Sequence, residues 1–341
     1  AGRTPCRSST GPTAGIHLQR PDRDRRVPGT GDVSQLSDPS KIDKAFDQLG
    51  YISNDRIATA VFLAQQLTKP ILVEGPPGVG KTELAIASSE MLDIPLIRLQ
   101  CYEGLDEAKA LYEWKYGKQL LYTQVLKEKL GDVMQGAKSL PEAMGQLHSF
   151  SDVFFSHDFL EPRPLLKALE AENGAVLLID EIDKSDYEFE AYLLEILSAY
   201  QISVPEIGVI KAKIPPIVFL TSNNTREMGD ALKRRCLHLY IPFPDEKMER
   251  RIVAARVPAA AESLRKQLVA FVHALRAEEL KKVPAISETI DWARTLLLLN
   301  VSELDVETVR RTINVLLKFQ EDVEAVDRQL YKFVKQAKEA V

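Results

Sequence analysis

The chain has 341 residues, of which 45% are hydrophobic, so it can bury the core of one large domain or two moderate ones. Its formal net charge of −5 argues against a general nucleic-acid coat, although a local basic patch would not show in the total. Its longest apolar runs are too short to cross a bilayer, so we expect no membrane insertion.

Three cysteines, Cys6, Cys101 and Cys236, stand far apart, with no C-x-x-C pair and no histidine at metal-ligand spacing. This pattern predicts a reducing, cytoplasmic location and no structural zinc. His148 and His157 lie around an aromatic stretch, and we favour ordinary structural roles for them over a metal site.

Residues 1–40 are rich in Arg, Pro, Gly and Ser and show almost no apolar periodicity, which predicts a disordered tail. The segment has no apolar region of the kind that a secretory signal needs, and its aspartates count against a transit peptide. A flexible tail or a mis-assigned start is the expectation.

From Lys41 onward, two helical segments lead into five short strand candidates, at residues 71–74, 95–100, 175–180, 216–222 and 237–241. Helical stretches separate most of these strands. Strands that alternate with helices indicate an α/β fold with a parallel sheet covered on both faces. We assign residues 41–244 to this domain.

After Pro244 the sequence predicts only helices, so residues 245–341 form a second, all-helical domain. A long helical run extends from Asp305 to about Lys338. Its apolar residues recur at three- and four-residue steps: Val306, Val309, Ile313, Leu316, Val323, Val326 and Leu330. This stripe is short for a partner-binding coiled coil, so packing within a small bundle is favoured.

A glycine- and proline-rich turn lies between the strand at 71–74 and the helix that follows it. Its residues fit G-x-x-x-x-G-K-[ST]: Gly75, Pro76, Pro77, Gly78, Val79, Gly80, Lys81 and Thr82. Such a loop points successive backbone N–H groups inward at a helix N-terminus, where phosphate is the natural occupant. Lys81 adds charge for the β- and γ-phosphates, and the Thr82 hydroxyl can ligate Mg²⁺. The turn therefore predicts a bound nucleotide.

The apolar strand in AVLLIDEIDK delivers Asp180 and Glu181 at its carboxyl end, the edge where α/β sheets bind ligands. We expect Asp180 to hold Mg²⁺ through water and Glu181 to orient and deprotonate an attacking water. The alternative is a strand end that merely meets an acidic helix cap. Asp183 and Lys184 are interpreted as surface or helix-start residues.

A third polar segment, VFLTSNNTREMGDALKRRC, ends a strand with an amide that can stand between the two motifs above. Asn223 is the candidate to reach the γ-phosphate or the attacking water. Downstream, Arg234 and Arg235 are not needed by the same site, and a surface guanidinium there suits an arginine finger for a neighbouring subunit. Arg235 is the preferred finger, and a solvated basic face is the alternative.

Together, GPPGVGKT, LLIDEID, LTSNN, ALKRRC and the helical tail resemble an AAA+ ATPase with its lid domain. The stretches EGPPGVGKTELA, IRLQCYEGLD, LLIDEIDKSDYEFEAYLLEILSAYQISV and ALKRRCLHLYIPFPD are similar to the MoxR family. Within it they most resemble the CoxD group, the accessory ATPases of carbon monoxide dehydrogenase maturation. The resemblance covers roughly residues 41–338.

This resemblance implies a P-loop sheet in the order 5-1-4-3-2, ATP and Mg²⁺ as cofactors, and a usually hexameric ring with ATP sites between subunits. It implies chaperone-like remodelling beside a protein with a von Willebrand factor A domain. In the CoxD group the implied client is a molybdenum hydroxylase whose Mo/Cu site must receive sulfur and copper.

Carried over by position, the resemblance makes Lys81 and Thr82 the Walker A pair and Asp180 and Glu181 the Walker B pair. Asn223 becomes sensor 1, and Arg235 becomes the finger that acts on a neighbouring subunit.

The lid departs from the family pattern. Many MoxR relatives place a sensor 2 arginine at a small-Ser-Pro-Arg helix start, whereas AISETIDWAR has Thr289 at that position. Arg294, two turns into the helix, is the candidate substitute.

Residues 102–165 form an extended segment that includes the aromatic stretch LYEWKYGKQLLY. It could grip a client, but we favour core contacts for Trp114 and Tyr116. Residues 201–216 alternate like a hairpin that could project toward a pore or a client.

The leading hypothesis is a ring that couples Mg·ATP hydrolysis to remodelling of a client protein. A nucleic-acid motor or loader of the branch-migration type is one alternative, but the mixed charge of the helical tail makes nucleic acid an unfavoured partner. A metal-insertion motor like the magnesium chelatase ATPase subunit is another. A scaffold that hydrolyses nothing is least favoured, because Glu181 is present.

Overall fold

The computed structural model describes residues 38–124, 156–205 and 207–340. Residues 1–37 of the predicted tail and His148 lie outside these ranges. Helix α1 (Pro39–Gln48) begins just inside the first range, and the Asp38 side chain caps it by accepting a hydrogen bond from the Ser40 N–H at 3.0 Å.

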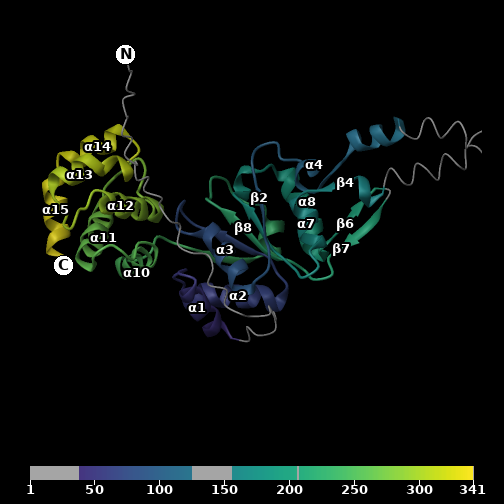
Figure 1. The fold of residues 1–341 in the computed structure, drawn as a ribbon, viewed down its shortest axis with the longest axis horizontal. Helices are drawn as coiled ribbons and strands as arrows, with labels where there is room; N and C mark the ends of the chain where they lie inside the picture. Colours follow the sequence, from purple (N-terminus) through teal and green to yellow (C-terminus); the bar gives the residue numbers. More distant parts are fainter. Residues whose placement is uncertain (1–37, 125–155, 206, 341) are drawn as a thin grey trace, which may run out of the picture.

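Five parallel strands form the central sheet: β1 (Ile71–Glu74), β2 (Leu96–Gln100), β5 (Val176–Asp180), β8 (Ile217–Ser222) and β9 (Leu237–Tyr240). Their order across the sheet is β2-β5-β8-β1-β9 (Figure 1). When these five strands are renumbered 1 to 5 along the chain and the sheet is described starting from β9, the order is 5-1-4-3-2. The predicted α/β fold and strand order are confirmed. The order brings the carboxyl ends of β1, β5 and β8 together at one edge.

Helices cover both faces of this sheet, because successive strand residues point to opposite sides. Ile71 and Val73 pack in one buried cluster with α1, α2 (Asp55–Leu67) and α3 (Lys81–Leu92). Leu72 packs in a second cluster with α7 (Pro164–Glu170), α8 (Tyr187–Ala199) and α9 (Asp230–Arg235). Burial on both faces explains why the three central strands, β1, β5 and β8, are almost continuously apolar until their carboxyl ends.

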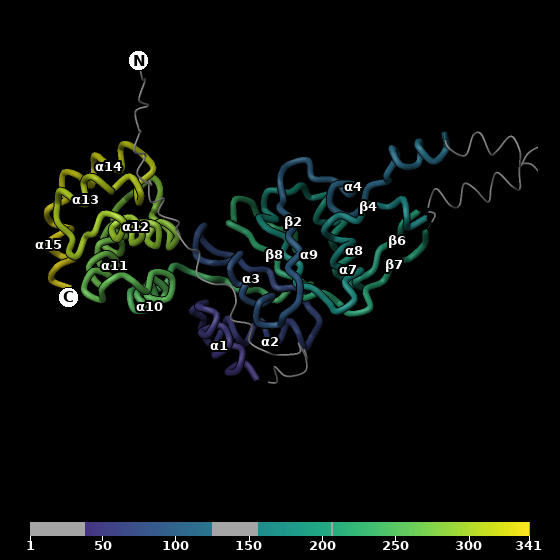
Figure 2. Tube along the Cα trace, viewed as in Figure 1, coloured from purple at the N-terminus to yellow at the C-terminus, as the bar shows by residue number. Residues whose placement is uncertain are grey.

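Two small antiparallel pairs lie outside the main sheet. In the first, β3 (Tyr112–Trp114) follows α4 (Glu107–Ala110) and pairs with β4 (Leu160–Pro162), which follows the 3₁₀ turn η2 (His157–Phe159). In the second, β6 (Gln201–Val204) pairs with β7 (Gly208–Lys211), so the predicted hairpin is present. Figures 1 and 2 show this hairpin at the end of the molecule opposite the C-terminal helices.

The prediction of core contacts in the extended segment holds for one aromatic residue and fails for the other. Trp114 is partly buried and packs against the sheet's core. Tyr116 is 66% exposed. The difference arises because Trp114 belongs to a paired strand, whereas Tyr116 starts a helical stretch whose side chains are largely exposed.

The described residues after Tyr240 contain helices and no strands. These are α10 (Glu246–Arg256), α11 (Glu262–Arg276), α12 (Ile286–Leu298), α13 (Val306–Thr312), η4 (Ile313–Val315), α14 (Gln320–Asp327) and α15 (Leu330–Glu339). They share a hydrophobic core of their own, with Phe271, Trp292 and Phe333 at its centre.

The predicted helical run from Asp305 to about Lys338 is divided into shorter pieces, because Phe319 has an extended backbone where α14 begins. Its apolar stripe nevertheless packs inside the bundle, where Val309, Leu316 and Leu330 are buried. No helix in the described ranges is long and apolar enough to cross a membrane.

Candidate functional site

The turn between β1 and α3 has a backbone that requires glycine. Gly78 and Gly80 have φ of +72° and +96°, in the left-handed region that favours glycine. A Cβ on Gly78 would lie 2.6 Å from the Ala285 Cβ and 2.7 Å from the Ser287 Oγ. The turn therefore lies directly against the start of α12, and a side chain at position 78 would separate the two.

Lys81 is buried under this turn, with 6% of its surface exposed. Its Nζ donates to the carbonyl oxygens of Gly75 and Pro76 at 2.7 Å each, and to the Asn223 Oδ1 at 2.8 Å. Burial lowers the pKa of Lys81 to about 8, although nearby carboxylates, with Asp183 foremost, act in the opposite direction. The structure thus joins the predicted Walker A lysine to the predicted sensor amide.

Thr82 and Asp180 are also brought together. The Thr82 Oγ1 donates to the Asp180 Oδ1 at 3.1 Å, and the Thr221 Oγ1 donates to the same oxygen at 2.5 Å. Asp180 lies at the carboxyl end of β5 and is 3% exposed. A hydroxyl and a carboxylate at this separation are hard oxygen donors of the kind that Mg²⁺ prefers, so these residues fit the predicted metal.

Two residues that the sequence analysis missed, Arg98 and Gln100, lie beside Asp180. The Arg98 Nη2 donates to the Asp180 Oδ2 at 2.5 Å and to the Gln100 Oε1 at 2.9 Å. The predicted strand order is the signal that could have found them: it makes β2 the neighbour of β5, and Gln100 pairs with Asp180 across the two strands.

Glu181 follows β5 in a left-handed backbone conformation, with φ of +56°. Such a conformation is costly for a residue with a side chain, and it is typical of functional sites. The Glu181 Oε2 accepts from Lys184 at 2.6 Å and from Gln100 at 2.8 Å, while the Oε1 accepts from the Asn223 Nδ2 at 3.3 Å. Glu181 and Asn223 are therefore close enough to act on the same water.

Asp183 was predicted to be a surface or helix-start residue; it does lie in a short helical turn, but it is not at the surface. The 3₁₀ turn η3 (Ile182–Lys184) buries it to 3% exposure, and its Oδ2 accepts from the N–H groups of Asn223 and Thr225 at 3.2 and 3.0 Å and from the Thr225 hydroxyl at 2.6 Å. Burial raises the pKa of Asp183, but these hydrogen bonds outweigh it and hold the pKa below its usual value. Asp183 fixes the loop that carries Asn223.

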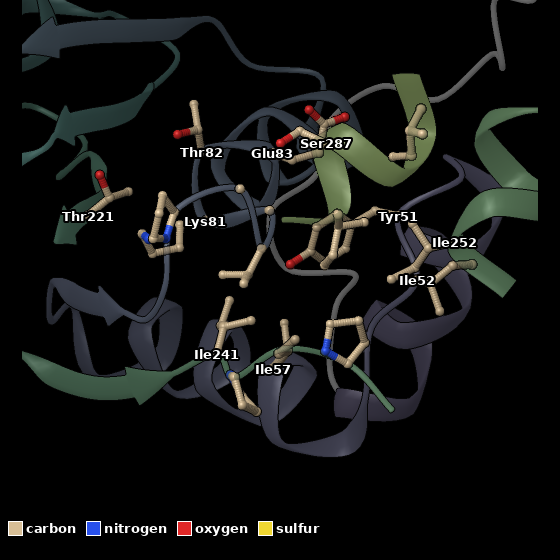
Figure 3. A pocket seen from close by; sticks show the side chains of 18 of the residues that line it. Tyr51, Ile52, Ile57, Lys81, Thr82, Glu83, Thr221, Ile241, Ile252 and Ser287 are labelled. Carbon is tan, nitrogen blue, oxygen red and sulfur yellow. The ribbon is translucent and has the colours of Figure 1, made fainter. Parts of the chain in front are cut away.

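A cavity of about 690 Å³ lies between this sheet edge and the helical domain, within the size range of small-molecule sites. Figure 3 shows Lys81 and Thr221 at one end and Tyr51, Ile52 and Ile252 at the other. One end is thus charged and the other apolar, which matches the phosphates and the flat base of a nucleotide. The sequence analysis did not identify this apolar end.

The helical domain lines one side of the cavity. Ser287 and Arg294 of α12 line it, so the candidate sensor 2 substitute lies in the cavity wall, where Arg294 pairs with Asp291 at 3.3 Å. Thr289, at the expected sensor position, is instead fully buried and donates to the Glu249 Oε1 at 2.8 Å.

The predicted finger residues lie outside this cluster. Arg234 and Arg235 are exposed at the end of α9, and neither lines the cavity. The Arg235 Nε donates to the Ser198 Oγ at 2.8 Å and its Nη1 to the Ala231 carbonyl at 3.3 Å. Arg234 makes no hydrogen bond or ion pair with any residue that the structure describes.

No group of three or more His, Cys, Asp or Glu side chains within the described ranges is arranged to hold a metal ion. His157, one of the two histidines considered above, is exposed and pairs with Glu170 at 2.5 Å.

Comparison with known proteins gives a match to one domain family and several similar proteins. Residues 70–236 match the family described as "AAA domain (dynein-related subfamily)". Uncharacterized proteins of Staphylococcus aureus strains USA300, NCTC 8325 and Mu50 are 26% identical over 271 residues, covering 76% of this chain and 89% of theirs. A solved structure of a candidate ATPase from Cytophaga hutchinsonii is 13% identical, covers 89% of this chain and 94% of that chain, and has a TM-score of 0.40.

The family match, the five-stranded parallel sheet and the helical region that follows it identify the P-loop AAA+ fold. An AAA domain supports nucleotide binding and ATPase activity in general.

Proposed function

We propose that this chain, which carries the P-loop AAA+ fold, hydrolyses ATP with Mg²⁺ and uses the energy to remodel or mature a client protein, as MoxR-type ATPases do. One observation carries the enzymatic part. Side chains from the P-loop and from the ends of strands β5 and β8, namely Lys81, Thr82, Asp180, Glu181 and Asn223, meet in one cavity.

The roles of these residues follow from their chemistry. The P-loop N–H groups and Lys81 bind the phosphates, while Thr82 and Asp180 would hold Mg²⁺, which supplies positive charge to the phosphoryl oxygens when bound. Glu181 accepts a proton from the attacking water, and Asn223 positions that water, because the two side chains already share a hydrogen bond.

We propose that the active form is a hexameric ring in which a neighbouring subunit completes each site. Two exposed arginines on α9, outside the cavity, are suited to this purpose. Arg235 is engaged by its own subunit, whereas Arg234 has no partner among the described residues and is free to reach across. Either guanidinium can stabilise charge on a transferring phosphate.

The remodelling part of the proposal rests on the MoxR-like sequence stretches and on the contact between the P-loop and α12. Because Gly78 lies against Ala285 and Ser287, a change in the nucleotide is transmitted to the helical domain. We propose a molybdenum hydroxylase as the client and a von Willebrand factor A protein as a partner. The β6–β7 hairpin, far from the helical domain, is a candidate client contact (Figure 2).

A trapping experiment tests this proposal. Glu181→Gln should bind Mg·ATP and fail to split it, with the hydrolysis rate reduced by about 10²–10⁴-fold. Glu188→Gln, which changes an exposed carboxylate in the first turn of α8, is the matched control and should hydrolyse ATP at the wild-type rate. The stalled complex is then recovered from native extract and its proteins are identified by mass spectrometry.

A molybdenum hydroxylase subunit or a von Willebrand factor A protein in the trapped complex, absent with the control, would support the client assignment. DNA with repair proteins would favour a nucleic-acid motor, and a chelatase subunit would favour metal insertion. Normal hydrolysis by the Glu181→Gln variant would contradict the enzymatic proposal itself.

A further inference from the structure

The Arg98 guanidinium forms an ion pair with Asp180, the carboxylate that we propose as an Mg²⁺ ligand. Its Nη2 lies 2.5 Å from the Asp180 Oδ2. The Asp180 side chain is 4% exposed, whereas the Arg98 side chain is 52% exposed and lines the cavity. The pair therefore joins a fixed, buried carboxylate to an arginine that has room to move.

A buried carboxylate is costly unless a positive charge compensates it. The hydroxyls of Thr82 and Thr221 donate hydrogen bonds to Asp180, but they carry no charge. Arg98 supplies a full positive charge, and it does so at the oxygen that Thr221 does not contact. The guanidinium thus gives Asp180 the compensation that a divalent cation would otherwise provide.

We propose that Arg98 is a tethered counterion of Asp180 that must leave the carboxylate before Mg²⁺ binds. This inference rests on the proposed function, because it concerns the same site. Mg²⁺ alone must compete with the guanidinium. Mg²⁺ that arrives with a nucleotide brings phosphate oxygens, which are new ligands for the metal and new anionic partners for Arg98 in the same cavity. The site should therefore take up the metal together with nucleotide and bind it poorly alone.

Binding of Mn²⁺ to the full chain without nucleotide tests this proposal, with free Mn²⁺ followed by electron paramagnetic resonance. Arg98→Met removes the charge at similar length, and Arg98→Gln removes the charge but keeps hydrogen-bonding groups. Both variants should bind Mn²⁺ about tenfold more tightly than the wild type, since a unit positive charge has been removed beside the metal position. The difference in Mn²⁺ affinity between the variants and the wild type should become smaller when ADP is present.

Arg310→Met is the matched control, because Arg310 is 56% exposed and pairs with Asp327 at 2.7 Å on the helical domain, away from the cavity. It should bind Mn²⁺ as the wild type does. Equal Mn²⁺ affinity in the wild type, Arg98→Gln and Arg310→Met would overturn the proposal. Arg98→Gln keeps the test decisive where Arg98→Met does not fold.

ATP hydrolysis by the wild-type preparation is measured in parallel. If the wild type hydrolyses ATP but the Arg98 variants bind Mn²⁺ as it does, only the proposed counterion role of Arg98 is refuted. A wild type that does not hydrolyse Mg·ATP would refute the proposed function.

Discussion

The Lys81 ammonium and the Asn223 amide oxygen lie 2.8 Å apart, so the P-loop and the loop after β8 are joined by a hydrogen bond across the nucleotide site. The same ammonium is held by two P-loop carbonyls. Phosphates that engage Lys81 must compete with these oxygens, and the release of Asn223 would accompany their arrival.

Nucleotide affinity should fall as pH rises through about 8, because Lys81 loses its proton near that pH in the free protein and only the charged form attracts phosphate. The expected loss is up to about tenfold per pH unit. Titration of a fluorescent ADP analogue between pH 7 and 10 measures it. Lys81→Arg is the control: it should bind with a weaker but nearly constant affinity, because arginine stays charged throughout.

The stability of the nucleotide-free protein should change in the opposite sense. The pKa of Lys81 is lowered from 10.5 to about 8, so between these values the unfolded chain holds more protons than the folded one. The free energy of unfolding therefore rises with pH in this window through the Lys81 contribution. Comparing urea melts of the wild type and Lys81→Met across the window isolates this contribution, and parallel pH profiles would count against it.

Asp183→Ala should lower both stability and hydrolysis, although Asp183 does not line the cavity. The substitution leaves the N–H groups of Asn223 and Thr225 without their buried acceptor. Each unsatisfied group costs about 1–3 kcal/mol, and the loop that carries Asn223 would lose its fixed position. Thermal melting and steady-state ATPase assays measure the two effects.

Lys184→Ala is the control variant for Asp183→Ala, because Lys184 is the exposed neighbour of Asp183 in the sequence. Lys184 also pairs with Glu181, so this control serves for stability only. That variant should keep its melting temperature close to the wild-type value. A normal melting temperature for Asp183→Ala would show that the three hydrogen bonds to Asp183 contribute little.

Arg234→Ala and Arg235→Ala should separate the two finger candidates. If Arg234 acts on a neighbouring subunit, its removal should lower the hydrolysis rate of the assembled protein by about 10³-fold or more and leave nucleotide affinity unchanged. Arg235→Ala should also disturb the contact with Ser198 within its own subunit. Mixing the Arg234→Ala and Glu181→Gln variants tests action between subunits. A site that takes Glu181 from the Arg234→Ala chain and Arg234 from the neighbouring Glu181→Gln chain regains activity. No recovery in mixtures would exclude action in trans.

The helical domain should depend strongly on Arg276. This side chain is 9% exposed, forms two hydrogen bonds to the fully buried Glu249, and donates to the Pro284 carbonyl at 2.8 Å just before α12. Removing one partner of a buried pair costs about 3–5 kcal/mol, so Arg276→Ala should unfold at markedly lower denaturant concentration. Lys266→Ala, which breaks only a surface pair with Glu262, should change the midpoint little.

Acid should weaken the same cluster. Burial raises the pKa of Glu249, but hydrogen bonds from His273 and Arg276 lower it more, so the pKa lies below its usual value of 4.5. A carboxylate with a lowered pKa contributes stability above its unfolded pKa, and that contribution is lost as pH falls through the folded value. Melting temperatures of the wild type and Glu249→Gln should converge as pH falls below 4.5 and through the lowered pKa of Glu249.

The sequence predicted the parts of this site that depend on local chemistry. The P-loop residues are consecutive, and Asp180 and Glu181 end a strand that is recognisable by itself. Asp183 and Arg98 were missed because their importance comes from partners far along the chain: Asp183 and Asn223 are separated by 40 residues, and Arg98 and Asp180 by 82. Only the predicted strand order, which places β2 beside β5, links Arg98 to Asp180, and nothing adjacent to Asp183 indicates its partner. The apolar end of the cavity was missed for the same reason, since β9, α10 and α12 each supply only part of it.

The close approach of Gly78 to Ala285 and Ser287 also has a mechanical consequence. Helix α12 starts at this contact and continues for 13 residues, a length of about 20 Å. A tilt of about 10° at the phosphate end would move the other end by about 3 Å. That end carries Leu298, which is 73% exposed. A small tilt of α12 at the P-loop would therefore move the far end of the helix much further. That movement is large enough to make or break a contact between the far end and another protein.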